Sequence, residues 1–278
     1  MSDLTVNAAT RTALLALQNA ADARLDAARR LESGKRVERV GDDPAAFFQA
    51  RALSNRIADI DETGRRIGQA LSAVETGLVG IEAAEELVQQ LRGLALSAQD
   101  ASADRLPTIT QQFDILRNQL DALAADVSYG GVSLLDDPAG TVSVEVGDIS
   151  GATADITGQA ASASALGIGT AAGTYNGFAS SADIAAAVSA IDGAVNAVLR
   201  GAASRLGSGV ALLNIRETFS SDLSATLQGG VDDLVLADLD EEAARLVSAR
   251  TRDQLGTFSL GVAAESETAI QQLLGIGS

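Results

Sequence analysis

Carboxylates are the residues of this chain with the most obvious capacity for chemistry. Its 278 residues include 37 Asp and Glu but neither His nor Cys. Without His the chain lacks the commonest general base and nucleophile activator, and without Cys it has neither disulfides nor thiolate metal ligands. Paired carboxylates could still perform acid–base catalysis, but no pair is distinguished by its spacing. We therefore predict that the protein is not an enzyme and uses no cofactor.

Two groups of Asp residues could serve as ligands for a cation. In the first, Gly41 to Pro44, Asp43 is better explained as the N-cap of a helix whose first position is Pro44. A calcium ion needs six or more converging oxygens, which this segment does not supply. The second group has no fixed loop spacing and consists of Asp136, Asp137, Asp148 and Asp155. We therefore predict no metal site in either group.

Arginine provides the other chemistry, because its planar guanidinium can pair with a carboxylate through two hydrogen bonds. The net charge is −17, yet residues 1–66 hold 11 basic and 10 acidic residues, whereas residues 67–182 hold 3 and 14. This acidic balance disfavours nucleic acid and anionic membranes as partners. The candidates for salt links between subunits are Arg36, Arg39, Arg51 and Arg56. Each of them could equally be an exposed arginine that contributes little.

Long helices must position these charges. From Pro44 to Gln99, apolar residues recur every seven residues, and a second set follows the first by four residues. This spacing forms one stripe along an α-helix of about 80 Å, as in a coiled coil. The stripe includes Leu53, Ile57, Ile60, Ile67, Leu71, Val74, Leu78, Ile81 and Val88. A helix of this length must bury its stripe against other helices, within the chain or between subunits.

Two further helical segments can cover this stripe. After a turn at Asp100–Leu106, Pro107 lies in the first turn of a helix that the short connection makes an antiparallel neighbour. A further apolar stripe begins near Asp183, and we expect Gln228–Gly230 and the acidic stretch Val231–Asp240 to interrupt it. The apolar sides contain Leu116 and Leu123 in the first of these helices, and Ile191 and Val198 in the second.

Both ends of the chain read as amphipathic helices. Residues 1–33 end at Gly34, and the last helix begins at Asp240. Their apolar faces contain Leu14, Leu17, Leu25 and Leu31 at one end, and Leu246, Leu255, Phe258, Val262 and Leu273 at the other. Isolated amphipathic helices are marginal in water. We therefore expect residues 1–33 and 240–278 to be mobile until they pack against other copies.

The segment Ser128–Ser181 differs from the rest, with frequent Gly and Ala and few charges. Val142, Val144 and Val146 alternate with polar residues, which predicts a strand, and Ala154–Thr157 is its expected hairpin partner. The predicted fold is mainly α, with long antiparallel helical rods or coiled coils and a small central β-hairpin and loop region. Its segments are residues 1–34, 35–135, 136–182, 183–239 and 240–278.

Neither a targeting signal nor a membrane span is expected. Residues 1–20 lack a basic flank, a continuous apolar run and a small-residue cleavage site, so they do not resemble a secretory signal peptide. No stretch approaches 18 apolar residues, the length that would predict a transmembrane helix.

Several motifs of the chain resemble those of bacterial flagellin. Residues 31–37 (LESGKRV) and 42–45 (DDPA) resemble the family segment L-S-S-G-x-R-(I/V)…D-D-(A/P)-A. Residues 87–97 (LVQQLRGLALS) are similar to its L-x-R-(V/I)-R-E-L-A-x-Q-(S/A) stretch. Residues 129–135 (YGGVSLL) resemble its F-N-G-x-x-L-L turn, and residues 237–242 (ADLDEE) resemble its A-D-x-(A/S)-x-E segment. The similarity covers about residues 1–135 and 183–278, with the motifs in the family's order.

This resemblance implies a structural subunit that polymerises into the flagellar filament for swimming motility. In the family the terminal helices form an inner coiled-coil layer, the long helices form the next layer, and variable outer domains are inserted where this chain has residues 128–181. The family is exported unfolded through the flagellar type III apparatus and acts outside the cell. The partners implied are other copies, filament cap and hook-junction proteins, and an export chaperone that would hold Leu246, Phe258 and Val262.

The stretch that the innate immune flagellin receptor contacts in this family is altered. The chain retains Arg92 and Leu94 but has Gln90 and Gly93 where the family has Arg and Glu, which argues against recognition by that receptor.

Three alternatives remain. Residues 35–44 also resemble the hook–filament junction protein of the same superfamily. A cytoplasmic coiled-coil signalling module would need heptads that continue through its central tip, and Ser128–Ser181 breaks them. A glycan-binding adhesin would have only Tyr129, Tyr175 and Phe178 in the insertion as stacking aromatics.

Overall fold

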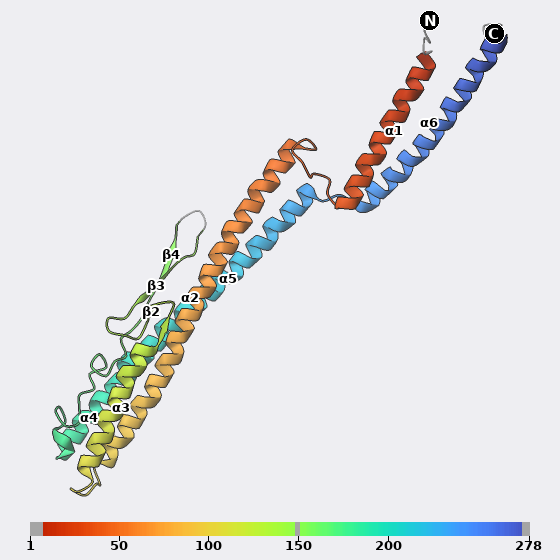
Figure 1. The fold of residues 1–278 in the computed structure, drawn as a ribbon. Coiled ribbons are helices and arrows are strands. Elements are labelled where there is room, and N and C mark those ends of the chain that lie inside the picture. The colour runs from red at the N-terminus through yellow and green to blue at the C-terminus, as the bar shows by residue number, and fades with distance from the viewer. Residues whose placement is uncertain (1–7, 148–150, 274–278) are drawn as a thin grey trace. The chain divides into compact units, whose positions relative to one another are not determined.

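A computed structural model describes residues 8–147 and 151–273 (Figure 1). Its helices are α1 (Ala8–Ser33), α2 (Pro44–Ser97), α3 (Leu106–Asp126), η1 (Asn176–Phe178), α4 (Ser181–Gly193), η2 (Ala194–Leu199), α5 (Arg200–Val235) and α6 (Leu239–Leu273). Its strands are β1 (Ser128–Tyr129), β2 (Val132–Ser133), β3 (Thr141–Glu145) and β4 (Thr153–Thr157). The chain divides into unit 1, residues 1–55 and 227–278, and unit 2, residues 56–226. The predicted mainly α fold with a small hairpin is confirmed.

The ends of the helices follow the local sequence. Asp43 Oδ1 accepts a hydrogen bond from the Ala46 N–H at 3.1 Å, so Asp43 caps α2 and Pro44 occupies its first position. Gly34 follows α1 with a φ of +68°, and its N–H donates to the Arg30 carbonyl at 2.9 Å. The predicted cap and the predicted stop are therefore both present.

The core of unit 2 lies along one side of α2. Ile67, Val74 and Val88 on that side are fully buried. The side chains that cover them from the other elements include Phe113, Leu120, Leu135, Ile191 and Leu199. Leu116, Leu123 and Val198 pack at the margin of this core and are partly buried. In unit 1, Leu53 is half-buried beside Gly230.

Two short hairpins lie on the helices of unit 2. β1 pairs with β2 around Gly130 and Gly131, whose φ values of +58° and +86° suit a tight hairpin turn. β3 pairs with β4 in antiparallel register, with Val142 opposite Ile156. Alternate residues of both strands are buried, and Ile156 packs against Gly209 of α5, where an added Cβ would lie 2.9 Å from it. The predicted β3–β4 hairpin is confirmed.

The expected interruption is wrong at Gln228–Gly230 and confirmed within Val231–Asp240. α5 continues through both glycines to Val235, although each interior Gly disfavours a helix by about 1 kcal/mol relative to Ala. Tertiary packing overrides this propensity, and Gly230 lies against Leu53 of α2. The chain breaks at Leu236, within that acidic stretch. Leu236 forms a β-bridge with Lys35, and α6 begins at Leu239.

The expectation that no stretch is long and apolar enough to span a membrane also needs correction. In the described part of the chain, the helix from Ser181 to Val235 contains an 18-residue window with a mean hydropathy of 1.5, which is long and apolar enough to cross a membrane. The core helix of a soluble protein passes the same test. A share of 33% of that window is buried within the structure, and Ile191 and Leu199 of the same helix lie in the core of unit 2.

Candidate assembly surfaces

α1 and α6 lie side by side in unit 1 and run antiparallel (Figure 1). The seam between them has the spacing of three and four residues found in coiled coils. On α1 it consists of Ala13, Leu17, Ala20, Arg24, Ala27 and Leu31, all buried or half-buried. On α6 it consists of Glu242, Leu246, Ala249, Asp253, Gly256, Leu260 and Ala263. Gly256 permits a close approach, because a Cβ there would lie 3.1 Å from Leu17 Cδ1.

Ion pairs fix the register of this seam. Arg30 Nη1 lies 3.2 Å from Glu242 Oε1, and Arg24 Nη1 lies 3.8 Å from Asp253 Oδ2. The Glu242 side chain is only 4% exposed, and its Oε1 also accepts from Arg245 at 3.0 Å. Its Oε2 has no hydrogen-bond partner among the described residues. A carboxylate buried this deeply requires its arginine partners, so the seam is specific in register.

The terminal helices were expected to pack against other copies, but α1 and α6 already pack against each other within one chain. Small residues bring α1 and α6 close together, and the arginine–carboxylate pairs complete the contact. The predicted assembly residues of α6 also fall on two faces. Leu246 lies in the seam, whereas Leu255, Phe258 and Val262 point away from it, with Val247 on the same exposed stripe.

Large apolar side chains therefore remain on the outside of the pair. Leu25 of α1 is 61% exposed, and Phe258 of α6 is 73% exposed. Leu14 is exposed as well, whereas Leu17 and Leu31 are half-buried in the seam. The side chain of Leu273 lies outside the described residues. Large exposed apolar patches are typical of surfaces that bind another macromolecule.

Arg36 and Asp42, which lie in the segment between α1 and α2, form hydrogen bonds within the chain. Arg36 Nη2 donates to the Leu234 carbonyl at 2.8 Å. Asp42 Oδ2 accepts from the N–H groups of Arg39 and Glu38 at 2.9 and 3.0 Å, and these backbone hydrogen bonds lower the pKa of Asp42. Of the remaining predicted arginines, Arg39 and Arg51 are exposed and Arg56 is half-buried.

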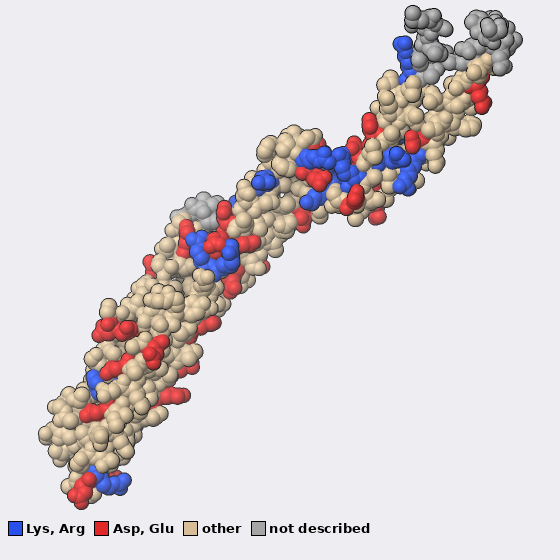
Figure 2. All heavy atoms as spheres, in the orientation of Figure 1, with Lys and Arg blue, Asp and Glu red and all other residues tan. Residues whose placement is uncertain are grey.

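Both signs of charge are present in unit 1, whereas unit 2 is acidic. Unit 2 contains 9 Arg and 21 Asp and Glu, a net charge of −12. Figure 2 shows acidic side chains along the visible face of unit 2, with wide uncharged areas between them. Contacts between copies of unit 2 must therefore use the uncharged areas or pair the acidic side chains with basic ones.

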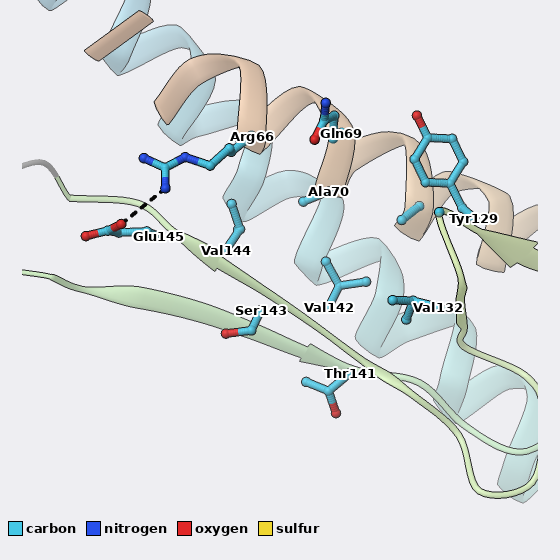
Figure 3. Close-up of a pocket in the computed structure, with 12 residues that line it drawn as sticks. Arg66, Gln69, Ala70, Tyr129, Val132, Thr141, Val142, Ser143, Val144 and Glu145 are labelled. Atoms are coloured by element: carbon cyan, nitrogen blue, oxygen red, sulfur yellow. Dashed lines mark hydrogen bonds and ion pairs between the residues drawn. The ribbon is translucent and has the colours of Figure 1, made fainter. Parts of the chain in front are cut away.

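A groove of about 510 Å³ lies between α2 and the hairpins of unit 2 (Figure 3). Val142 and Val144 point toward α2, and Tyr129 borders the groove at the β1–β2 turn. Arg66 Nη1 lies 3.4 Å from Glu145 Oε2, and both side chains are about half exposed. These two charges pair with each other, and the arrangement contains no group of side chains suited to catalysis.

A second groove of about 430 Å³ contains most of the immune-receptor-like stretch. Its lining is Gln90, Gly93 and Leu94 from α2 with Gln112, Ile115, Leu116 and Gln119 from α3. Arg92 is turned to another partner, because its Nε lies 2.8 Å from Asp192 Oδ1 of α4. The structure therefore brings Gln90 and Leu94 together and separates Arg92 from them. Within the described ranges no cluster of three His, Cys, Asp or Glu is placed to hold a metal ion.

Comparison with known proteins decides the family. Residues 4–139 match the family model of the bacterial flagellin N-terminal helical region. Flagellin FljM of Caulobacter vibrioides is 28% identical over 269 residues, covering 94% of this chain and 95% of FljM. Flagellin FljK of the same organism is 27% identical over 278 residues, covering 98% of each chain. The chain belongs to the flagellin family.

The fold of this flagellin also has a counterpart among solved structures. A Vibrio parahaemolyticus protein described as flagellar hook-associated superposes with a TM-score of 0.57 at 16% identity, over 70% of this chain and 100% of that one. At this identity the likeness concerns the fold alone. The relatives over nearly the full length are flagellins, so the hook–filament junction alternative has weaker support than the filament subunit.

Proposed function

We propose that this flagellin builds the flagellar filament through the outward faces of its paired terminal helices. Flagellins are structural proteins, and the family implies assembly into a polymer. The observation that carries the proposal is the α1–α6 pair, which uses small residues for its own seam and leaves Leu25, Leu255 and Phe258 exposed. Exposed apolar side chains favour association because burial against another copy removes them from water.

The proposal gives each part of the chain a place in the filament. Residues 1–34 and 240–278 form the inner layer of the filament, and residues 35–135 and 183–239 form the surrounding rods. Residues 136–182 replace larger outer domains. The subunit leaves the cell through the flagellar type III export apparatus, with an export chaperone on the stripe containing Phe258 and Val262. In the extracellular filament it meets cap and hook-junction proteins at the two ends.

Seeded polymerisation of full-length chains tests the role of the stripe. Phe258→Glu and Leu255→Glu place a charge on the face opposite the seam, so we expect α1 and α6 to stay paired while the critical concentration for growth rises about 100-fold or more. That factor corresponds to about 2.7 kcal/mol per contact. The matched control is Thr257→Glu, an exposed position beside Phe258 and off the stripe.

Folding and polymerisation of the three variants are measured separately. Circular dichroism should show unchanged helix content in all three variants, and only Thr257→Glu should polymerise at concentrations close to those of the unmodified chain. Normal filaments from Phe258→Glu and Leu255→Glu would disprove the assembly role of this stripe.

A further inference from the structure

The turn at Asn176 and Gly177 contains the only Asn–Gly pair of the sequence. This pair is chemically labile, because Gly has no side chain to hinder attack by its own amide nitrogen on the preceding Asn. In that reaction the Gly177 nitrogen bonds to Asn176 Cγ, the side-chain amide leaves as ammonia, and a succinimide ring remains. Water then opens the ring to aspartate or to isoaspartate, in which the backbone runs through the side chain.

The structure holds this pair in a rare backbone conformation. The φ values of Asn176, Gly177 and Phe178 are +45°, +67° and +61°. Asn and Gly adopt the left-handed region readily, whereas a bulky residue such as Phe178 is an outlier there. A conformation of this kind persists only where its surroundings determine it. The contacts of the turn, and not its own preference, therefore keep it in place.

Both sides of the Asn176–Gly177 peptide bond are hydrogen-bonded. The Gly177 N–H, whose nitrogen is the attacking atom, donates to the Ala171 carbonyl at 2.8 Å. The Asn176 carbonyl accepts from the Ala179 N–H at 3.3 Å. The peptide group is planar and moves as one body, so ring closure requires both hydrogen bonds to break.

The packing of Phe178 also resists that movement. Phe178 is 1% exposed, with its ring edge-on to Phe113 at a centroid distance of 5.4 Å and stacked on Tyr175 at 6.3 Å. The Thr110 hydroxyl donates to the Gly177 carbonyl at 3.3 Å. Rotation of the preceding peptide would therefore disturb a buried aromatic cluster.

The carbonyl that accepts from Gly177 is itself anchored to α3. Asp114 Oδ1 accepts from the Ala171 N–H at 2.6 Å, and Asp114 Oδ2 accepts from the Ala172 N–H at 3.4 Å. The side chain of Ala171 is fully buried. Asp114 therefore positions the residue that holds the attacking nitrogen away from Asn176 Cγ.

Water is not excluded from the turn. Asn176 is exposed and borders a hollow of about 650 Å³, which Asp114 and Asn118 of α3 also line. Solvent for the hydrolysis is therefore present in the folded chain. Any protection of Asn176 must come from the fixed geometry of the peptide bond.

We propose that Asn176–Gly177 is a deamidation site that is open in the unfolded chain and closed by folding. A chain that has formed isoaspartate cannot rebuild the turn, because the longer backbone displaces the Gly177 N–H from Ala171. Aspartate at the same position places a second carboxylate beside Asp114. The modification goes beyond the proposed function, and only its occasion, the interval before export of an unfolded chain, rests on that function.

The first test compares deamidation of the full chain in guanidinium chloride and, as dispersed monomer, in native buffer at the same neutral pH and temperature. Peptide mapping by mass spectrometry measures conversion at Asn176, and an isoaspartyl methyltransferase detects isoaspartate. Folding should slow the reaction by about 30-fold or more, the factor expected for two hydrogen bonds of ordinary net strength. A peptide of residues 173–180 in both solutions corrects for the denaturant. Asn118, exposed and followed by Gln, is the internal reference and should react slowly in both.

The second test loosens the anchor on α3. Asp114→Ala should raise the rate at Asn176 in native buffer by about 10-fold, the effect of losing one hydrogen bond to a charged group. Asp126→Ala is the matched control, because Asp126 is an exposed residue of the same helix and the charge change is the same. Circular dichroism should show both variants folded. Asn176→Gly accepts the left-handed φ and should abolish the mass gain of this peptide.

Three results would overturn the proposal. They are equal corrected rates in native buffer and in denaturant, no conversion of Asn176 in the unfolded chain, or an equal rise in Asp114→Ala and Asp126→Ala. All are measured without filaments, so failure of the chain to polymerise would overturn the proposed function and leave this site intact.

Discussion

The terminal helix pair of unit 1 and the helical bundle of unit 2 use the same spacing for opposite purposes. Both have seams that alternate at three and four residues. In unit 2 the seam positions of α2 are large, and Ile67, Val74 and Val88 are completely buried. In unit 1 the buried positions of α1 are Ala20 and Ala27, Leu17 and Leu31 are half-buried, and Leu14, Leu15 and Leu25 are exposed.

This difference shows that side-chain size, and not spacing, decides where the stabilisation of a helix comes from. Burial of apolar surface contributes about 25 cal/mol per Å², so a seam of alanines stabilises a helix pair far less than a seam of isoleucine and valine. Unit 2 therefore obtains its stability within one chain. The α1–α6 pair has a specific register but small residues at the buried positions of α1, and its large exposed side chains gain most from other copies.

Truncation in the bundle should give the largest effect and sharpen this contrast. Phe113 is fully buried, with its ring edge-on to Phe178 at a centroid distance of 5.4 Å and to Tyr175 at 6.2 Å. Phe113→Ala should lower the free energy of unfolding by about 3–5 kcal/mol, measured by denaturant titration. The exposed Phe219→Ala is the control and should lower it by less than about 1 kcal/mol. Equal losses from both would contradict the contrast between buried and exposed aromatics.

Overfilling the alanine seam should give an intermediate effect confined to the chain ends. Ala27 is buried between α1 and α6, so Ala27→Leu should force the helices apart at a cost of about 1–3 kcal/mol. Amide exchange should then accelerate in α1 and α6 while protection in α2 and α3 stays unchanged. Leu15→Ala, at an exposed position of α1, is the control and should leave exchange unaltered. Unprotected α1 amides in the unmodified chain would contradict the existence of the seam.

The sequence was sufficient for the parts of the fold that depend on local chemistry. Short stretches of sequence predict the cap at Asp43, the stop at Gly34 and the alternation in β3 and β4. The seam of α2 could be predicted because its seven-residue repeat recurs along the whole helix. The break was predicted to start too early, at Gln228, because the contact of Gly230 with Leu53, which favours a continuous helix, joins residues far apart in sequence.

The assembly surfaces were harder to predict for a physical reason. On α6 the seam of Leu246 and Ala249 is less apolar than the outward stripe of Leu255 and Phe258, so a search for apolar residues merges the two faces.

The smallest predicted effect concerns the turn that joins the two helices of the N-terminal half. Hydrogen bonds from the N–H groups of Arg39 and Glu38 lower the pKa of Asp42 below its ordinary value of 3.8. Because the folded pKa is the lower one, the stabilisation is present above the ordinary value and is lost as the pH falls through the folded pKa. The amide chemical shifts of Arg39 and Glu38 should therefore titrate together below about pH 4.

Asp42→Asn should abolish that titration while the amides of α3 in unit 2 remain unaffected in both proteins. Asp43→Asn is the matched control. It keeps an N-cap acceptor for Ala46 and leaves Asp42 in place, so the titration of Arg39 and Glu38 should persist. If the titration survived in Asp42→Asn, another carboxylate would hold this turn. A response in unit 1 without one in unit 2 would show that protonation of Asp42 acts on this turn alone.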